Sequence, residues 1–513
     1  MSVPTVPSAA ASPRPSPPDN DSGQAATPAD GIPADAPWYA GVTRYQWLVL
    51  IIASLGWVFD VFEGQIFVAS MNEAMPSLVP SGTAAGQIAL YNSMALGAFL
   101  LGGSLGGIVF GMLSDRYGRT RTLSLTILFY SLFTCLSAFS QDWWHLVGFR
   151  FLVALGVGGE WAVASALVAE VFPARARAHA GGIFHATSVL GTYLAIAAGA
   201  FLIGNTAVQS WALSTEGTWV SSIVDPASLP WRLGFAIGVI PAFLIIWIRR
   251  QLREPESWET AKARAVRDPG EGMGRLGGLF RDGYLGRTVI GVTLAAVAMA
   301  TFWGVHIYGK NALRDAVAQR YVNTASAPAA AVASPATASS GVTSATARAA
   351  ILAPHTASLK RWEMLGMFLV TTGGGIGLLC FGPLSQRIGR RGAFLLYHIG
   401  GLVSALLVFQ VLGTVGALLV ALPVFGMLTL GMHAGYAIYF PELYPTRLRG
   451  TGTGFCFNAG RAVAAPVILS VGWVQATFGM TLADVASWAS LLFLVGAAAL
   501  IFAPETRGRA LLE

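Results

Sequence analysis

The first candidates for function in this sequence are the ionisable residues that lie inside long apolar stretches. One stretch holds Asp60 and Glu63, a second holds Arg150 and Glu160, and a third holds Arg461. A charged side chain at the centre of a membrane-spanning helix costs about 2.5–3.5 kcal/mol on insertion scales. Residues kept there at such a cost are expected to have a function.

The two acids of the first stretch are predicted to couple to protons. Asp60 and Glu63 are three residues apart, which places them on one face of a helix. Two neighbouring carboxylates repel each other, so one of them takes up a proton more readily, as reversible proton transfer requires. The alternative is structural: Asp60 forms a buried ion pair with Arg150 that fixes two helices together.

Arg461 is predicted to bind an anionic substrate. A guanidinium presents a planar fork of donors that meets a carboxylate with two hydrogen bonds, and it stays charged in a cavity. The alternative for Arg461 is a role as the partner of an internal acid. Further residues predicted to line the same site are Arg150, Asn458, Glu160, His306 and Tyr436. For a lone histidine in a helix, hydrogen-bonded packing is the competing interpretation.

Membrane-spanning helices must position these residues. Only 11% of the 513 residues are charged and 54% are hydrophobic, whereas soluble domains carry about a quarter charged residues. A spanning helix needs about 20 mostly apolar residues. The sequence therefore predicts an all-α integral membrane protein with twelve transmembrane helices in two six-helix halves. The twelve segments lie at roughly 46–69, 87–113, 120–140, 144–170, 180–204, 231–249, 286–308, 362–384, 392–412, 415–440, 452–477 and 484–503.

The segments between the helices complete the predicted organisation. Most Lys and Arg residues fall on one side when both termini are placed in the cytoplasm, as expected for a multi-pass protein of the cytoplasmic membrane. The parts are a disordered cytoplasmic tail (1–40), an N-terminal half (41–250), a cytoplasmic linker (251–285), a C-terminal half (286–505) and a cytoplasmic tail (506–513). A flexible extracytoplasmic insert, rich in Ala, Ser, Thr and Pro, is predicted at about 311–358.

Several classes of function are excluded. The net charge of +7 is spread between apolar stretches rather than gathered on one face, so no nucleic-acid partner is expected. The three cysteines are too far apart for a metal motif. No ATP-binding loop and no nucleophile or metal motif of an enzyme occurs. We therefore predict no catalytic residues, no cofactor and no metal, and the lipid bilayer as the surroundings.

The two halves repeat the same motifs. GMLSDRYGRTR begins at Gly111, and GPLSQRIGRR begins at Gly382. AEVFPARARAHAGG contains Glu170, and PELYPTRLRGTGTG contains Glu442, with nearly the same separation along the chain as in the first pair. Six-helix halves repeated in parallel are typical of transporters whose site lies between the halves.

These motifs resemble the major facilitator superfamily. The resemblance covers nearly the whole chain and includes the run from Arg150 to Trp161 and the tags PES and PETRG. Within the superfamily, GWVFDVFE, GVGGEW and CFNAGR are most similar to the proton-coupled organic-acid symporters, which carry sialate, lactate and aromatic acids. That branch has Asp-Gly-x-Asp in the first span, where this chain has Val61 and Glu63. The resemblance implies proton-coupled symport of a small monocarboxylate by alternating access, in a protein that functions as a monomer.

The resemblance also implies a cytoplasmic gate that closes the inward side. Asp115 is expected to face the positive end of a neighbouring helix, and arginines are expected to meet acids of the adjoining bundle. Gln386 replaces the acid in the second copy, which suggests a weaker latch there. The predicted gate residues are Asp115, Arg116, Gly118, Arg119, Glu170, Arg175, Arg387, Arg390, Glu442 and Arg447.

Two other functions remain open at this point. The chain could carry a neutral sugar or polyol, or export a metabolite or drug, and Arg461 would then be dispensable. A nutrient sensor that keeps the fold without transporting is the second alternative, although neither terminus suggests a long folded extension.

Overall fold

The computed structural model describes residues 36–83, 85–203, 205–268, 272–281, 283–332 and 345–512. It forms two units, Met1–Gly41 and Val42–Glu513. Most of the predicted N-terminal tail, residues 1–35, lies outside the described residues. Within the described ranges every regular element is helical, so the all-α prediction is confirmed.

The first group of helices belongs to the predicted N-terminal half. Its helices are α1 (Arg44–Ser77), α2 (Ala85–Tyr117), α3 (Arg119–Ser137), α4 (Trp143–Val171), α5 (Ala174–Ala186), α6 (Ser188–Ala198), α7 (Thr206–Leu213), α8 (Leu229–Ala236) and α9 (Ala242–Gln251), with short turns at Gly199–Ile203, Pro226–Ser228 and Ile237–Val239. The linker that follows contains α10 (Glu256–Arg267) and a short turn at Leu276–Phe280.

The second group of helices belongs to the predicted C-terminal half. Its helices are α11 (Leu285–Gly304), α12 (Gly309–Val332), α13 (Ala345–Leu352), α14 (Thr356–Leu406), α15 (Val415–Leu430), α16 (His433–Leu443), α17 (Arg449–Phe478), α18 (Leu482–Ser490) and α19 (Leu492–Phe502), with short turns at His306–Tyr308, Ala353–His355, Leu407–Val411 and Thr446–Leu448. Gly389 has φ 84° and interrupts α14, as Gly118 at φ 114° separates α2 from α3. Only glycine adopts this backbone easily, so both copies of the loop motif turn at the same place.

Nine segments of the described residues are long and apolar enough to cross a membrane. Two of the twelve expected segments fall together in Arg361–Val411, on either side of Gly389. The segments of α3 and α17 are not among the nine, so the number twelve stays a prediction. The nine are Arg44–Met71, Leu90–Tyr117, Trp143–Val171, Ala174–Ile203, Pro226–Gln251, Leu285–Ala325, Arg361–Val411, Val415–Leu443 and Leu482–Phe502.

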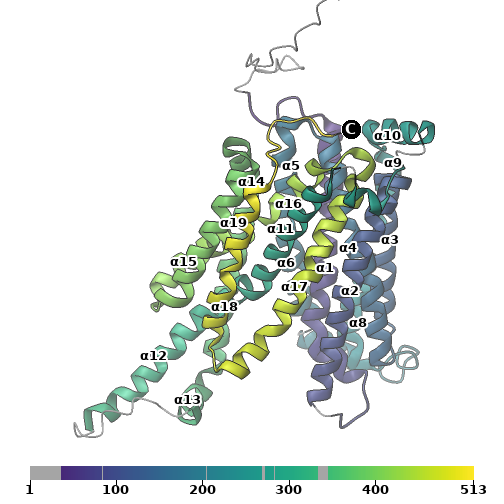
Figure 1. Cartoon of the computed structure of the whole chain (residues 1–513). Helices are drawn as coiled ribbons and strands as arrows, with labels where there is room; N and C mark the ends of the chain where they lie inside the picture. Colours follow the sequence, from purple (N-terminus) through teal and green to yellow (C-terminus); the bar gives the residue numbers. More distant parts are fainter. Residues whose placement is uncertain are drawn as a thin grey trace, which may run out of the picture. The chain divides into compact units, whose positions relative to one another are not determined.

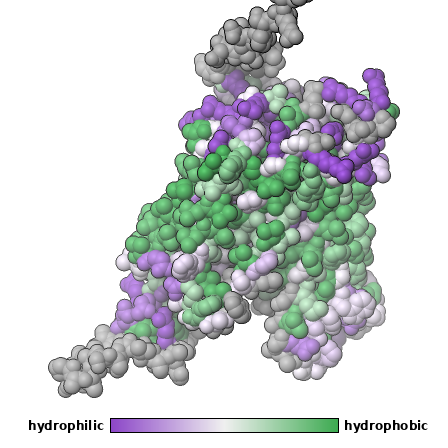
Figure 2. All heavy atoms as spheres, viewed as in Figure 1, coloured by the Kyte–Doolittle hydropathy of each residue, from purple (hydrophilic) through white to green (hydrophobic). Residues whose placement is uncertain are grey.

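The outer surface of the Val42–Glu513 unit is apolar around its middle. Figure 2 shows a band of hydrophobic residues on the face in view, with hydrophilic residues gathered beyond it. Large apolar side chains such as Leu101, Phe201 and Val420 are two-thirds exposed or more. Water would not favour such a surface, whereas lipid hydrocarbon does.

Helices of the two halves pack directly against each other. α2 contacts α17, and α5 contacts both α14 and α16. The loops with the repeated motifs, the linker helix α10 and the C-terminus lie together at one end of the bundle (Figure 1). We call this the motif end. The arrangement leaves α1, α4 and α17 side by side through the interior, where α17 contacts α4 and α4 contacts α1.

Helices occupy both ends of the predicted insert at 311–358. α12 and α13 occupy much of it, while residues 333–344 lie outside the described part. Val317 and Ala318 of α12 are buried with Leu359 of α14 in a small separate core. The overall composition obscured this apolar stripe, which is confined to the beginning of the insert.

Candidate functional site

Three carboxylates, not two, lie together inside the N-terminal half. Asp60 and Glu63 of α1 are 2% and 0% exposed, and Glu160 of α4 is 0% exposed. The negative charges of both glutamates act on Asp60. Five oxygens of this cluster have no hydrogen-bond partner: Asp60 Oδ2 and both carboxylate oxygens of Glu63 and of Glu160. Buried carboxylates without partners are costly when charged, so the cluster favours holding protons.

Arg461 of α17 faces this cluster from the C-terminal half. Its charge acts on Asp60, and its guanidinium carbon lies 5.4 Å from the centre of the Phe457 ring. No ion pair to Arg461 occurs among the described residues. Gly103 of α2 makes its approach possible, because a Cβ there would collide with the guanidinium. Gly107 leaves room in the same way for the side chain of Asn458, whose amide oxygen has no partner.

Arg150 does not form the ion pair with Asp60 that we considered from the sequence. Its guanidinium donates to the backbone carbonyl of Glu63 over 3.0 Å and lies 4.3 Å from the centre of the Phe99 ring. The aromatic faces of Phe67 and Phe99 compensate a cation that has no carboxylate hydrogen bond in the described structure. Arg150 therefore holds α1 against α4 beside the cluster.

An aromatic contact joins the two halves next to Arg461. The rings of Trp161 from α4 and Phe457 from α17 stack with 4.1 Å between their centroids. The Trp161 indole N–H donates to Nδ1 of His185 over 3.0 Å, which fixes the orientation of the indole. Neither Trp161 nor Phe457 was predicted to have a role, although each lies next to a predicted site residue.

Two further sequence candidates, His306 and Tyr436, lie within the predicted C-terminal half. Nδ1 of His306 is 2.7 Å from the hydroxyl of Thr429, and its ring stacks on Phe302. Tyr436 of α16 is fully buried between the rings of Phe394 and Phe440, and its hydroxyl has no hydrogen-bond partner. Neither side chain is hydrogen-bonded to Arg461 in the described part of the structure.

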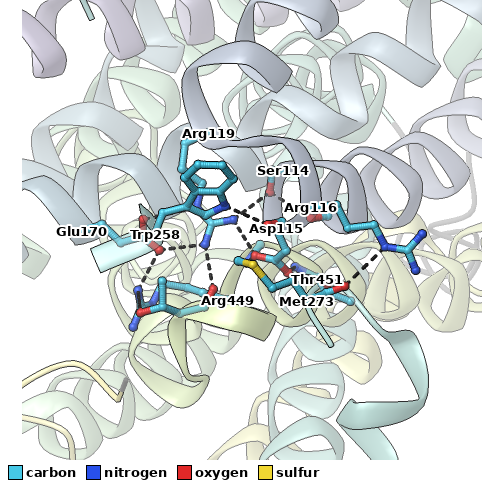
Figure 3. Close-up of polar contacts among 12 residues, drawn as sticks. Ser114, Asp115, Arg116, Arg119, Glu170, Trp258, Met273, Arg449 and Thr451 are labelled. Carbon is cyan, nitrogen blue, oxygen red and sulfur yellow. Dashed lines mark hydrogen bonds and ion pairs between the residues drawn. The ribbon is translucent and has the colours of Figure 1, made fainter. Parts of the chain in front are cut away.

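At the motif end, Asp115 of α2 caps the first turn of α17 (Figure 3). Its carboxylate accepts hydrogen bonds from the backbone N–H groups of Gly450 and Thr451 over 3.0 and 2.7 Å, and from the Thr451 hydroxyl. The free N–H groups and the dipole at a helix start favour a negative charge. Asp115 therefore connects α2 of the N-terminal half to α17 of the C-terminal half.

Glu170 forms a second bond between the halves. One of its oxygens lies 2.8 Å from Arg119 of α3 and 2.7 Å from Arg449 of α17. Arg119 also bonds Asp115 and donates to the backbone carbonyl of Thr446. The side chains of all four charged groups are fully buried. The acid partners of Arg119 lie in its own half, which corrects the expectation that it meets an acid of the other bundle.

The linker closes over this network. The indole of Trp258 in α10 is buried and donates to the backbone carbonyl of Asp115 over 2.7 Å. Glu254 accepts from the backbone N–H groups of Arg119 and Thr120 over 2.6 and 3.2 Å, and so caps α3. Arg116 donates to the Met273 carbonyl instead of meeting an acid. The linker is therefore packed against the bundle and not simply a solvated connection.

The second motif copy repeats these contacts with a looser bond between the halves. Arg390 lies 2.9 Å from Glu442, as Arg119 does from Glu170. Gln386 donates to two carbonyls of the N-terminal half over 3.2 and 3.3 Å, where Asp115 accepts from a helix start. The counterpart of Arg449, which is Arg177, is 4.0 Å from Glu442. The contacts across the halves are therefore unequal in the two copies.

Glu505 has the position in the second copy that Glu254 has in the first. Burial opposes ionisation of Glu505, but backbone N–H groups of Arg390, Arg507, Arg391 and Thr506 hold its pKa below its usual range. The carboxylate therefore remains charged and caps the helix that resumes after Gly389.

The remaining predicted gate residues contribute their backbone. The carbonyl of Arg175 accepts from Gln386, that of Arg447 accepts from the Gly274 N–H, and that of Arg387 accepts from Arg507. The structure adds five residues to the predicted gate: Arg449, Thr451, Glu254, Trp258 and Glu505. Arg449 has the position in the second motif copy that Arg177 has in the first, and neither arginine was predicted to belong to the gate.

Comparisons with known proteins agree with this architecture. Residues 64–468 match the Major Facilitator Superfamily. The sialic acid transporter of Escherichia coli (strain K12) is 25% identical over 474 residues, which are 90% of this chain and 96% of that protein. The "Probable 4-methylmuconolactone transporter" of Cupriavidus pinatubonensis is 27% identical over 476 residues, 92% of this chain and 94% of that protein.

A solved structure shares the fold. The structure of a proton:xylose symporter of the same superfamily matches with a TM-score of 0.64 at 16% identity, and the match covers 91% of this chain and 98% of that one. Likeness at this identity concerns the fold alone. The family match spans well over half of the chain and agrees with the repeated motifs and the apolar helices. This chain therefore belongs to the Major Facilitator Superfamily, a family of multi-pass membrane transporters and not of enzymes.

Proposed function

We propose that this chain is a secondary active transporter that carries a small monocarboxylate together with protons. The observation that carries the proposal is the position of Arg461 within electrostatic range of Asp60, beside two further buried carboxylates. A cation suited to a carboxylate stands there next to groups that can hold a proton. The names of the two relatives, which refer to sialic acid and a muconolactone, favour an organic acid over a neutral sugar.

The proposed coupling follows from competition for Arg461. When Asp60 is ionised, its charge attracts the guanidinium and opposes the entry of a second carboxylate. When Asp60 takes up a proton, Arg461 is free to bind the carboxylate of the substrate. Proton and substrate then bind with positive coupling, because each favours the state that the other requires.

The proposed arrangement has twelve spans in the inner membrane of the cell. Both termini lie in the cytoplasm. The count is reached when Gly389 divides α14 and when α3 and α17 are included. The arginines of the motif loops favour the cytoplasmic side for the motif end. One chain supplies both sides of the site, which supports function as a monomer.

The hydrogen bonds and ion pairs at the motif end would hold the transporter in a state that is closed to the cytoplasm. Asp115 and Glu170 both hold the start of α17, so the cytoplasmic side can open only when these bonds break. Substrate would then enter from the opposite side, and rocking of the halves would exchange the two states.

The direct test is uptake by proteoliposomes with and without an imposed proton gradient. Lactate, pyruvate, sialate and benzoates form the panel, with xylose as the neutral control. We expect at least one acid to accumulate only when the gradient is imposed, and xylose not to accumulate. Absence of gradient-dependent uptake of every acid would contradict the proposed coupling, and xylose uptake would favour a sugar carrier.

Asp115→Asn is expected to shift the protein toward the state that is open to the cytoplasm. The amide keeps the size of the carboxylate but removes the charge that binds Arg119 and the start of α17. A cysteine at Thr453, placed in a background without the three native cysteines, reports the opening. Thr453 is buried on the face of α17 that carries Phe457 and Arg461, because these residues are four apart.

The expected result is faster labelling of this cysteine by a thiol reagent, by at least about fivefold, the lower end of a typical coupling energy. Gln386→Ala is the matched control in the second motif copy and should change the labelling less, since it removes two long hydrogen bonds. Unchanged labelling in correctly inserted Asp115→Asn would remove the proposed role of the gate.

A further inference from the structure

Two buried polar atoms on one face of α16 lack hydrogen-bond partners. Neither the carboxylate cluster with Arg461 nor the gate gives them a role. They are Nε2 of His433 and the hydroxyl oxygen of Tyr436. The side chains are three residues apart, their rings lie 5.7 Å from each other, and the residues are 4% and 0% exposed. Buried polar groups nearly always have a hydrogen-bond partner, so this pair requires one from outside the described side chains.

The tautomer of His433 defines what that partner must offer. Nδ1 of His433 lies 3.1 Å from the backbone carbonyl of Leu430, which can only accept, so Nδ1 carries the hydrogen. In the neutral ring Nε2 is then an acceptor. The partner must donate a hydrogen bond to His433 and can accept one from Tyr436. A hydroxyl group does both, whereas a carbonyl cannot donate and an ammonium cannot accept.

This pair is connected to the proposed carboxylate site. Arg461 lies over Phe457, Phe457 stacks on Trp161, and Trp161 donates to His185. His185 lies within electrostatic range of His433, and α16 packs against α4, α5 and α17. The aromatic row therefore leads from Arg461 to His185 on α5, a helix that packs against the one that carries His433 and Tyr436.

We infer that His433 and Tyr436 form a second polar subsite that binds a hydroxyl group of the substrate, so that the carried acid is a hydroxy acid. This inference rests on the proposed function, because it assumes that Arg461 binds the carboxylate. The aromatic side chains between the two subsites would contact the carbon skeleton of the acid.

The test compares acids that differ by one hydroxyl group. The pairs are lactate with propionate and 4-hydroxybenzoate with benzoate, and the quantity is the ratio of kcat/KM for the hydroxylated acid to that for its partner. In the unmodified transporter we expect a ratio of about ten or more in at least one pair, since a site built to hydrogen-bond a hydroxyl discriminates against its absence.

Tyr436→Phe and His433→Leu should lower this ratio to about two or less in that pair, while uptake of the acid without the hydroxyl is retained. Tyr439→Phe is the matched control, because Tyr439 lies on the same helix and its hydroxyl donates to the Pro504 carbonyl at the motif end. This variant should keep the ratio. The melting temperature distinguishes the two tyrosines further. Tyr436→Phe removes a hydroxyl without a partner and should not lower the melting temperature. Tyr439→Phe removes a hydrogen bond and should lower it.

A ratio near one in both pairs for the unmodified protein, or a ratio that survives in Tyr436→Phe, would overturn this inference, since the pair then holds only a water molecule. Uptake of acids that depends on Arg461 but not on the hydroxyl overturns the subsite alone. Uptake of no acid at all overturns the proposed function together with it.

Discussion

Arg461→Ala is expected to lower uptake of the transported acid at least about 30-fold, mainly through a higher KM. Removing one partner of a buried charged pair costs about 2–5 kcal/mol, and 2 kcal/mol corresponds to this factor. Arg461 has no ion pair among the described residues, so its charge is available to the carboxylate of the substrate. Alanine removes that contact. Initial rates over a range of acid concentrations, measured in proteoliposomes, give KM and kcat separately.

Arg461→Lys should produce a smaller loss, because lysine keeps the charge but not the planar fork. Arg232→Lys is the matched control. Arg232 is a buried arginine of α8 that donates to the carbonyls of Ala138 and Ser140, away from Arg461. This control should leave KM unchanged even if it lowers the melting temperature. A folded Arg461→Ala protein with normal KM would favour the neutral-solute carrier.

Asp60→Asn is expected to abolish accumulation driven by a proton gradient while exchange of substrate across the membrane continues. Asn has the shape of the protonated acid, so Arg461 stays free to bind the carboxylate, but no proton is released. The accumulation ratio should fall at least about tenfold, which corresponds to ~1.4 kcal/mol of lost coupling. The measurements are gradient-driven uptake and counterflow in the same vesicle preparation.

The control for this prediction is Asp142→Asn. Asp142 caps α4 with a side chain that is 56% exposed, and asparagine is an equally good cap. Asp142→Asn should retain both gradient-driven uptake and counterflow. If Asp60→Asn accumulates substrate normally, the proton is carried by another group, and Glu160→Gln and Glu63→Gln then become the variants to compare.

The sequence predicted the fold class and the motifs because these depend on local properties. Apolar runs of about 20 residues identify helices that must lie in lipid, since only such helices satisfy the backbone there. The repeated motifs matched Arg119 with Arg390 and Glu170 with Glu442, and both copies carry the equivalent ion pair in the structure. The average composition of the insert hid the apolar residues around Val317, which the structure buries against α14.

The partners of the gate residues could not be predicted from the sequence. Asp115 was expected to face a helix start, but the sequence could not say that this helix is α17, which begins far along the chain in the other half. Arg449 was not placed in the gate, although it contributes the bond between the halves that its counterpart Arg177 makes only loosely. Partner choice of this kind depends on how the two halves approach, which no local pattern encodes.

Local sequence was therefore enough to identify the recurring motifs and the residues that are costly in a membrane. Asp60, Glu63, Glu160 and Arg461 stand out because charge inside an apolar helix must be compensated. The partners of these residues depended on how the whole chain packs. This packing made the acids a group of three, separated Arg150 from Asp60, and left His433 and Tyr436 unpartnered beside an aromatic row. The physical reason is distance: an electrostatic or hydrogen-bond interaction depends on a few ångströms between helices, and packing of the whole chain sets that separation.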